Sequence, residues 1–334
     1  MVVRNDIRNS SHDSDNRKKD IIVKTIIMLL LSFIVFIFAA VAWFAMNRDT
    51  TAGGMSVRMA DQGFELRVAD GTIAYNDLYA LLDASVRGTT NVQTSSAENG
   101  QIIRWRMSQG EEEIQPGSQG VLEFDVISTG ADVTAIRYSL HVSAYEAVTH
   151  IDQTTEEEVV DSLTEITSSS TSADARKGLS FINTHIMFFT GRNGTSADNY
   201  EYYGFISDKD DFELTLDANN HGVIYWIWPN TFGQIALLAS DTGYISGTPL
   251  LYSAAASYED DRDAVTEYMQ NNASDFFNGS DNYSSLITSL YNKRKAGTSY
   301  SSEFERLSEG YNSADQTIGQ NVDYALVHMV ANLR

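Results

Sequence analysis

Apolar and polar residues alternate in many short stretches of this chain, beginning after residue 54. Residues 55–59 (MSVRM) and 64–68 (FELRV) place an apolar side chain at every second position, which is typical of a strand with one buried face. The same alternation, or a short apolar run, recurs at residues 102–107, 121–127, 136–142, 185–189, 212–216, 223–228 and 322–330. Clusters of Gly, Asn, Asp and Ser separate these segments, so we expect an antiparallel β-sandwich rather than a parallel sheet.

Helical signals stand between these strands and do not alternate with them. Asn76 can cap a short helix, and residues 154–166 (TTEEEVVDSLTEI) begin with glutamates, where the helix dipole favours negative charge. A longer helical insertion is expected at about 253–310, with helices at 259–271 and 281–295. The pattern therefore predicts a mainly β domain that carries a helical insertion.

One stretch, residues 25–47, is apolar throughout and contains no ionisable side chain. At about 1.5 Å per residue it can cross a hydrocarbon layer of ~30 Å, which predicts a transmembrane helix in contact with membrane lipid. Four basic residues at 17–24 precede it and only Arg48 follows directly, so the positive-inside rule places the N-terminus in the cytoplasm. The residues that mark this span are Thr25, Phe33, Phe38, Trp43 and Asn47.

The apolar segment is either a retained anchor or a cleaved signal peptide. Ala40, Ala42 and Ala45 offer cleavage positions at its far end, whereas its length exceeds the usual signal-peptide core and favours retention. The chain then divides into a cytoplasmic segment at 1–24, the membrane segment at 25–47 and an extracellular domain at 48–334. Cleavage would release that domain as a secreted protein.

Charge and cysteine content narrow the classes of function. The formal net charge is −22, and the residues beyond Asn47 carry 17 basic against 41 acidic side chains, a surplus of 24 negative charges. Such a field repels phosphate backbones, so we expect no binding to nucleic acid. The chain contains no cysteine, which excludes disulfides, thiol catalysis and cysteine-ligated metals.

No motif of an enzyme or of a cofactor site is present in the sequence. Its six histidines include no H-E-x-x-H pattern, and the chain lacks a G-x-S-x-G elbow, a phosphate-binding lysine loop and a dinucleotide fingerprint. We therefore expect no catalytic residues and no cofactor. Calcium is the one metal with a candidate loop, residues 207–211 (SDKDD), but their spacing does not match an EF-hand, and a solvated acidic face is the preferred interpretation.

The densest aromatic cluster is Tyr225, Trp226 and Trp228, directly before Pro229. Exposed aromatic rings on a sandwich can stack on sugar rings, which makes this cluster a candidate ligand patch. In a strand, however, Trp226 and Trp228 face one side and Tyr225 the other. Core packing is the preferred interpretation, because a buried strand that ends at Pro229 accounts for every residue.

Three segments together resemble the TasA and camelysin group of exported Gram-positive surface proteins. They are AWFAMN at 42–47 leading to GGM at 53–55, IQPGSQG at 114–120 running into VLEFDVISTG, and ADQTIG at 314–319 before VDYALVHMVA. The resemblance implies a jelly-roll β-sandwich, processing by a SipW-type signal peptidase and, for some members, polymerisation into biofilm-matrix fibres. Camelysin has been classed as a metalloprotease, but no ligand set of that kind can be matched here residue by residue.

These observations lead to an expected function and two alternatives. We expect a non-enzymatic extracellular surface or matrix protein that self-associates by β-strand addition, with Met55, Val57 and Met59 as the apolar face of the added strand. The first alternative is an adhesin that binds a carbohydrate or host ligand through the aromatic cluster. The second is a metalloendopeptidase of camelysin type.

Overall fold

The structure is a computed structural model, and the residues that it describes belong to the second of two units of the chain, Gln62 to Arg334. The described residues are 63–68, 93–95, 102–107, 114–128, 130, 132–154, 158–170, 172–195, 200–238, 241, 250–251 and 259–333. The predicted membrane span and the predicted strand of Met55, Val57 and Met59 lie outside these residues. Within the described part of the chain, no helix is both long enough and apolar enough to cross a membrane.

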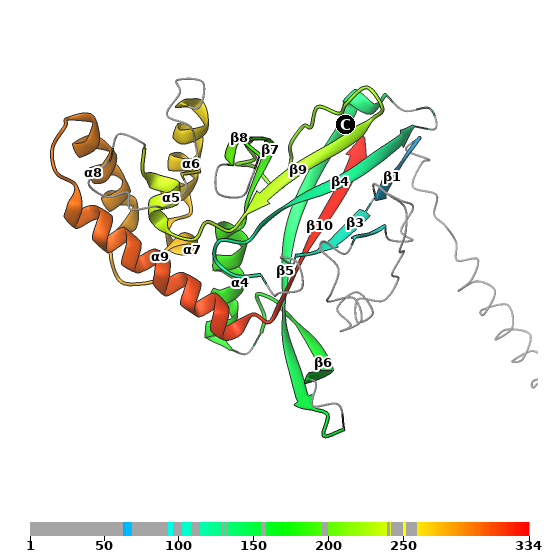
Figure 1. Ribbon diagram of the computed structural model, residues 1–334, viewed down its shortest axis with the longest axis horizontal. Helices are drawn as coiled ribbons and strands as arrows, with labels where there is room; N and C mark the ends of the chain where they lie inside the picture. The colour runs from blue at the N-terminus through cyan, green and yellow to red at the C-terminus, as the bar shows by residue number, and fades with distance from the viewer. Residues whose placement is uncertain are drawn as a thin grey trace, which may run out of the picture. The chain divides into compact units, whose positions relative to one another are not determined.

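Two five-stranded antiparallel sheets form the scaffold (Figure 1). The first sheet has the order β1 (Phe64–Val68), β4 (Gln119–Ser128), β9 (His221–Ile227), β7 (Met187–Asn193) and β8 (Glu201–Phe205). The second has the order β2 (Gln93–Ser95), β3 (Ile102–Arg106), β10 (Tyr324–Leu333), β5 (Ile136–Ile151) and β6 (Glu158–Ile166). The expectation of a mainly β chain with antiparallel sheets is thus confirmed.

The main core lies between the two sheets and follows from the alternation of the strands. In β4 the side chains of Leu122, Phe124 and Val126 are buried, while their neighbours along the strand are half-exposed. The Phe124 ring is 6.3 Å from the Trp105 ring of β3 and 5.7 Å from the Tyr138 ring of β5, centre to centre. Tilted aromatic pairs at such distances add to the stability that burial supplies.

Helices cover one end of this scaffold. They are α4 (Ala173–His185), α5 (Phe232–Ala236), α6 (Glu259–Asn271), α7 (Ala273–Phe276), α8 (Tyr283–Lys295) and α9 (Ser301–Asn321). The single turn η1 (Val133–Ala135) lies at the other end, directly before β5. Ser172 caps α4, because its side chain accepts a hydrogen bond from the backbone N–H of Ala175 at 3.1 Å. Asn282 caps α8 in the same way through Ser285.

A second hydrophobic core joins these helices to the first sheet. Met187 and Phe189 of β7, Tyr202 of β8 and Ile227 of β9 are buried on the side of the first sheet away from the main core, together with apolar residues of α5 to α9. Helices α4 and α9 also contribute to the main core, through residues that include Phe181 and Ile318. The helical region is therefore packed into the domain through both cores.

The structure corrects one predicted helix, reduces one predicted strand to a single bridge and shifts another along the chain. Residues 158–166 form strand β6, not a helix, because the register of β6 on β5 satisfies their backbone and overrides the glutamates at the start. In the predicted strand at 212–216, only Phe212 forms a bridge, to Tyr138. His185 ends helix α4, and strand β7 begins two residues later.

The helical insertion was expected at about 253–310, and its described helices extend from Glu259 to Asn321. The predicted helix at 259–271 has the same bounds as α6, and α8 lies within the predicted 281–295. Helix α9 continues to Asn321, directly before the last strand, and helix α4 was not expected from the sequence.

Candidate functional site

A cavity of about 530 Å³ lies where the helical region meets the sheets. Its lining comes from β5, from the end of α4, from the loop at 207–210 and from the second half of α6. These four segments are far apart in the sequence, and most of the side chains that they supply are polar. A concave site with convergent polar groups is the usual form of a small-ligand site.

Lys209 is the basic side chain of this cavity, and it is held at the C-terminal end of α4. Its Nζ donates hydrogen bonds to the backbone carbonyl of Asn183 and, at 3.0 Å, to that of Ile186. The same atom lies 5.2 Å from the centre of the Phe188 ring and 5.8 Å from that of Tyr268. Burial lowers the pKa of Lys209 to about 7, although the neighbouring Asp210 acts in the opposite direction.

Several other polar groups of the cavity wall are already satisfied. The side-chain amide of Asn183 accepts a hydrogen bond from the backbone N–H of Val142 at 3.3 Å and donates one to the backbone carbonyl of Val142 at 3.0 Å. The amide thus pairs with β5 as the backbone of a neighbouring strand would. Thr184 donates to the carbonyl of Phe181 at 2.9 Å. One carboxylate oxygen of Asp208 accepts the N–H groups of Asp210 and Asp211 at 3.0 and 3.3 Å. These bonds fix the shape of the wall.

The rim of the cavity carries polar groups of a different kind. Ser207, Asp210, Glu267 and Asn271 are exposed, and their side chains form no hydrogen bond with another described residue. Two of these side chains are carboxylates, one is an amide and one is a hydroxyl. The rim therefore has donors and acceptors that an incoming ligand can use.

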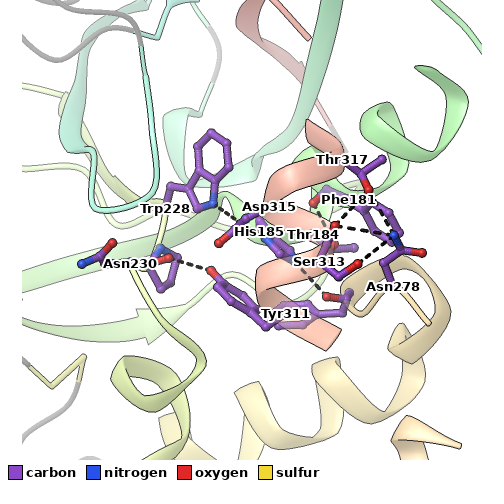
Figure 2. A network of polar contacts seen from close by, with 12 residues as sticks. Phe181, Thr184, His185, Trp228, Asn230, Asn278, Tyr311, Ser313, Asp315 and Thr317 are labelled. Carbon is purple, nitrogen blue, oxygen red and sulfur yellow. Dashed lines mark hydrogen bonds and ion pairs between the residues drawn. The ribbon is translucent and has the colours of Figure 1, made fainter. Parts of the chain in front are cut away.

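A buried polar network lies beside this cavity and joins α4, α9 and the end of β9 (Figure 2). The Nδ1 atom of His185 is 2.7 Å from the Oδ1 atom of Asp315, and the indole N–H of Trp228 donates to the same oxygen at 2.8 Å. The Nε2 atom of His185 is 2.8 Å from the carbonyl oxygen of Phe276. A backbone carbonyl only accepts hydrogen bonds, so Nε2 is the donor in that contact.

Tyr311 completes the network by stacking on His185. The two rings are 4.2 Å apart and inclined by 5°, and the Tyr311 hydroxyl donates to the carbonyl of Pro229 at 2.7 Å (Figure 2). His185 is fully buried, so its ring is not accessible to a substrate. We assign this group a structural role, which is to hold the helices on the sandwich.

The aromatic cluster considered in the sequence does not form a ligand patch. Trp226 and Trp228 are buried in the core between the sheets, because alternation along β9 turns them inward. Tyr225 is half-buried on the other side, where the Arg192 guanidinium carbon lies 4.7 Å from its ring centre. A ligand that stacks on Trp226 or Trp228 would first have to open the core.

The acidic residues considered for calcium are mostly engaged with the protein itself. Asp208 closes its own turn, and Asp211 forms an ion pair with Arg137, with 2.6 Å between Oδ1 and Nε. Among the described residues, no group of three acidic or histidine side chains is arranged to hold a metal ion. Residues 207–210 of this loop line the cavity.

The second sheet carries a row of basic side chains on its outer side. Strand register places Arg104 of β3 and His141 of β5 on either side of His328 of β10. The rings of His141 and His328 are 6.4 Å apart, and the Nε2 atom of His328 is buried with no hydrogen-bond partner in the described structure. Desolvation, followed by the charges of Arg104 and His141, lowers the pKa of His328 to about 4.

A second candidate site is the hairpin of β5 and β6, named here the β5–β6 arm (residues 146–166). The pairing of β10 with β5 ends at Tyr324 and Tyr145, whereas β5 and β6 stay paired as far as Ile151 and Glu158 (Figure 1). In the described strand order, β6 is the outermost strand of its sheet. The arm therefore extends lengthwise past the end of β10, where β5 is paired with β6.

Register shows which side chains the β5–β6 arm presents. Ala144 pairs with Ile166, and both are buried in the main core. Four residues further along β5, Val148 lies on the same face. The register shift after Val148 leaves the extra residue on β6, so the alternation of β5 is unbroken and Ile151 lies on the opposite face. Val148 is 59% exposed and Ile151 is 60% exposed. On the core face of the second sheet, β5 thus continues into solvent with the apolar Val148 between the polar side chains of Glu146 and His150.

The sequence alone identified some of these residues but not their grouping. The sequence pattern places Lys209 in an acidic stretch and Glu267 in a predicted helix, and it indicates no site for either residue. The one feature of the sequence that points to the cavity is the single basic residue within the acidic stretch SDKDD at 207–211. The contact of that lysine with the end of α4 depends on tertiary structure, which no local pattern encodes.

Comparison with known proteins gives no match: no family model, no curated protein and no solved structure is significantly similar to this chain.

Proposed function

We propose that this chain is a non-enzymatic extracellular surface or matrix protein that assembles by β-strand addition. The observation that carries the proposal is a pair of exposed apolar side chains on the β5–β6 arm, Val148 on one face and Ile151 on the other. Large apolar side chains exposed where a sheet extends beyond its core are unfavourable in a monomer, and natural proteins normally cover or charge such extensions. An arm that is covered in an assembly explains why these two side chains are apolar.

The segment proposed to cover the arm is the strand-like stretch at 55–59 of a second copy. Its alternating Met55, Val57 and Met59 would lie on the face of Val148, while its backbone would pair with the outer edge of β6. Charge favours this match. Residues 138–175 contain eight acidic side chains and no Lys or Arg, whereas residues 48–59 contain Arg48 and Arg58 against one aspartate.

In this proposal the segment at 25–47 either anchors the domain in the membrane or is removed on export. The jelly-roll type of sandwich and the likeness to the TasA and camelysin group belong to the same proposal. Its support is the pair of antiparallel sheets together with the segments at 42–55, 114–120 and 314–319 that carry the resemblance.

The proposal is tested by electron microscopy of residues 48–334 at high protein concentration. The parent should form filaments, and Val57→Asp should block them, because burying an unpaired carboxylate costs several kcal/mol. Ser56→Asp adds the same charge on the opposite face of the strand and should still polymerise. Filaments of equal abundance in both variants, or a parent that stays monomeric, would refute strand addition.

A further inference from the structure

The 530 Å³ cavity at the junction of sheets and helices has no part in the proposed assembly, yet it has the features of a binding site. It lies at Lys209 and α6, whereas the assembly surface is the far end of β5 and β6. Its wall is fixed by internal hydrogen bonds of Asn183, Thr184 and Asp208. A fixed wall lowers the entropic cost of binding a small ligand.

Groups of both charge signs converge on this cavity. Lys209 supplies the positive group, and its Nζ uses two donors on the carbonyls of Asn183 and Ile186. An ammonium group has three donors, so one remains for a ligand. Asp210 and Glu267 supply negative groups from two different elements, the loop and α6, and neither carboxylate is occupied by a hydrogen bond from a described residue.

This combination argues against the two simplest ligand classes. A metal ion needs several oxygen ligands in one shell, and no group of three suitable side chains within the described ranges is arranged to provide it. A simple anion would meet three carboxylates, those of Asp208, Asp210 and Glu267. A ligand that carries its own positive and negative charge satisfies both kinds of group at once.

We propose that the cavity binds a small zwitterion, an amino acid or short peptide, whose carboxylate contacts Lys209 and whose ammonium group contacts Glu267 and Asp210. The amide of Asn271 and the hydroxyl of Ser207 are available on the rim as further hydrogen-bond partners. The volume of about 530 Å³ is larger than one small amino acid, and it is open to solvent at this rim.

Binding of such a ligand is coupled to protonation of Lys209. Burial lowers the pKa of this amine to about 7, and a bound carboxylate would stabilise its charged form. The titratable groups around it are Asp208 and Asp210 from its own loop, Glu267 and Tyr268 from α6, and His141 from β5. Binding near pH 8 should therefore take up protons, and affinity should fall between pH 7 and pH 9.

The experiment uses the full chain in detergent micelles and isothermal titration calorimetry with a series of ω-amino acids. Glycine, β-alanine, γ-aminobutyrate and ε-aminocaproate separate the two charges by increasing lengths. The alkylamine and the carboxylic acid of each length serve as half-ligands. At least one ω-amino acid should bind about tenfold or more tightly than both of its half-ligands, with proton uptake at pH 8.

Two variants and a control locate the site. Glu267→Gln should weaken binding of the best ω-amino acid about tenfold and leave the fold intact, because this side chain is exposed. Lys209→Met should abolish the proton uptake. Glu305→Gln removes one exposed carboxylate from α9, outside the cavity, and should bind like the parent.

Each other outcome overturns the proposal. An alkylamine that binds as tightly as its amino acid indicates a site for cations, and an equally tight carboxylic acid indicates a site for anions. Equal weakening by Glu267→Gln and Glu305→Gln indicates unspecific attraction to the acidic surface. No measurable heat for any member of the series at millimolar concentration shows that the cavity does not bind this class of ligand.

Discussion

The Nδ1 atom of His185 lies 2.7 Å from the Oδ1 atom of Asp315, and this contact ties the last turn of α4 to α9. The same carboxylate oxygen accepts the indole N–H of Trp228, so one buried aspartate links two helices and the end of β9. The two helices and the sandwich are therefore held together by polar contacts as well as by apolar packing.

Asp315→Ala should destabilise the domain by about 3 kcal/mol. The substitution leaves the indole N–H of Trp228 and the ring of His185 buried without their common acceptor, and breaking a buried pair costs about 3–5 kcal/mol. Urea unfolding followed by tryptophan fluorescence measures the change. Glu65→Gln, which removes an exposed ion pair with Arg67, should leave the unfolding midpoint unchanged. Equal midpoints for both variants would contradict the assigned role of Asp315.

Lys209 should make stability rise with pH above neutrality. Its pKa is about 7 in the folded chain and about 10.4 when unfolded, so the unfolded chain binds more protons in this window. The free energy of unfolding should therefore increase between pH 7 and pH 10, by about 1–3 kcal/mol. Lys209→Met should lack this increase. A parent and a variant with parallel pH profiles would show that the amine keeps its ordinary pKa.

His328 should make the domain sensitive to acid. Its folded pKa is about 4, whereas an unfolded histidine titrates near 6.5, so the unfolded chain binds more protons between these values. Stability should fall by about 1–2 kcal/mol as the pH drops from about 6.5 to about 4. His328→Leu should reduce this loss, as measured by thermal unfolding at several pH values. An unchanged acid sensitivity would assign the effect to other groups.

Strands were predictable from the sequence where a regular alternation decides which face is buried. The predicted strand at 64–68 has the same bounds as β1, and the predicted 121–127 lies inside β4. Residues 154–166 were misassigned, because glutamates near a segment start are also compatible with a strand. The pairing of β6 with β5 decides the conformation, and it is a tertiary property.

Helix α4 was not predicted from the sequence, because its interior contains a residue that is unfavourable in helices. Gly178 stands in its interior, and glycine lowers helix propensity by about 1 kcal/mol relative to alanine. In the fold this glycine lies against the end of α9, where an added Cβ would be 3.3 Å from a methyl group of Val322. Gly178 thus allows α4 and α9 to pack closely, and it lowers the helix propensity from which α4 could have been predicted.

The cavity could not be derived from the sequence. Its four lining segments are separated by long stretches of chain, and none contains a recognisable motif. The β5–β6 arm was equally hidden, because its exposed Val148 and Ile151 resemble ordinary core positions of a strand. Only the point at which β10 stops pairing with β5 shows that these side chains lie beyond the core.

The most direct test of assembly through the β5–β6 arm is electron microscopy of residues 48–334 carrying Val148→Asp, with Val148→Thr as the matched control. Val148 is exposed, so a charge there should not disturb the monomer, whose melting temperature should remain within a few degrees of the parent. The account predicts filaments for the parent, filaments for Val148→Thr and none for Val148→Asp. Filaments of normal length in Val148→Asp, or a parent that remains monomeric under all conditions, would contradict it.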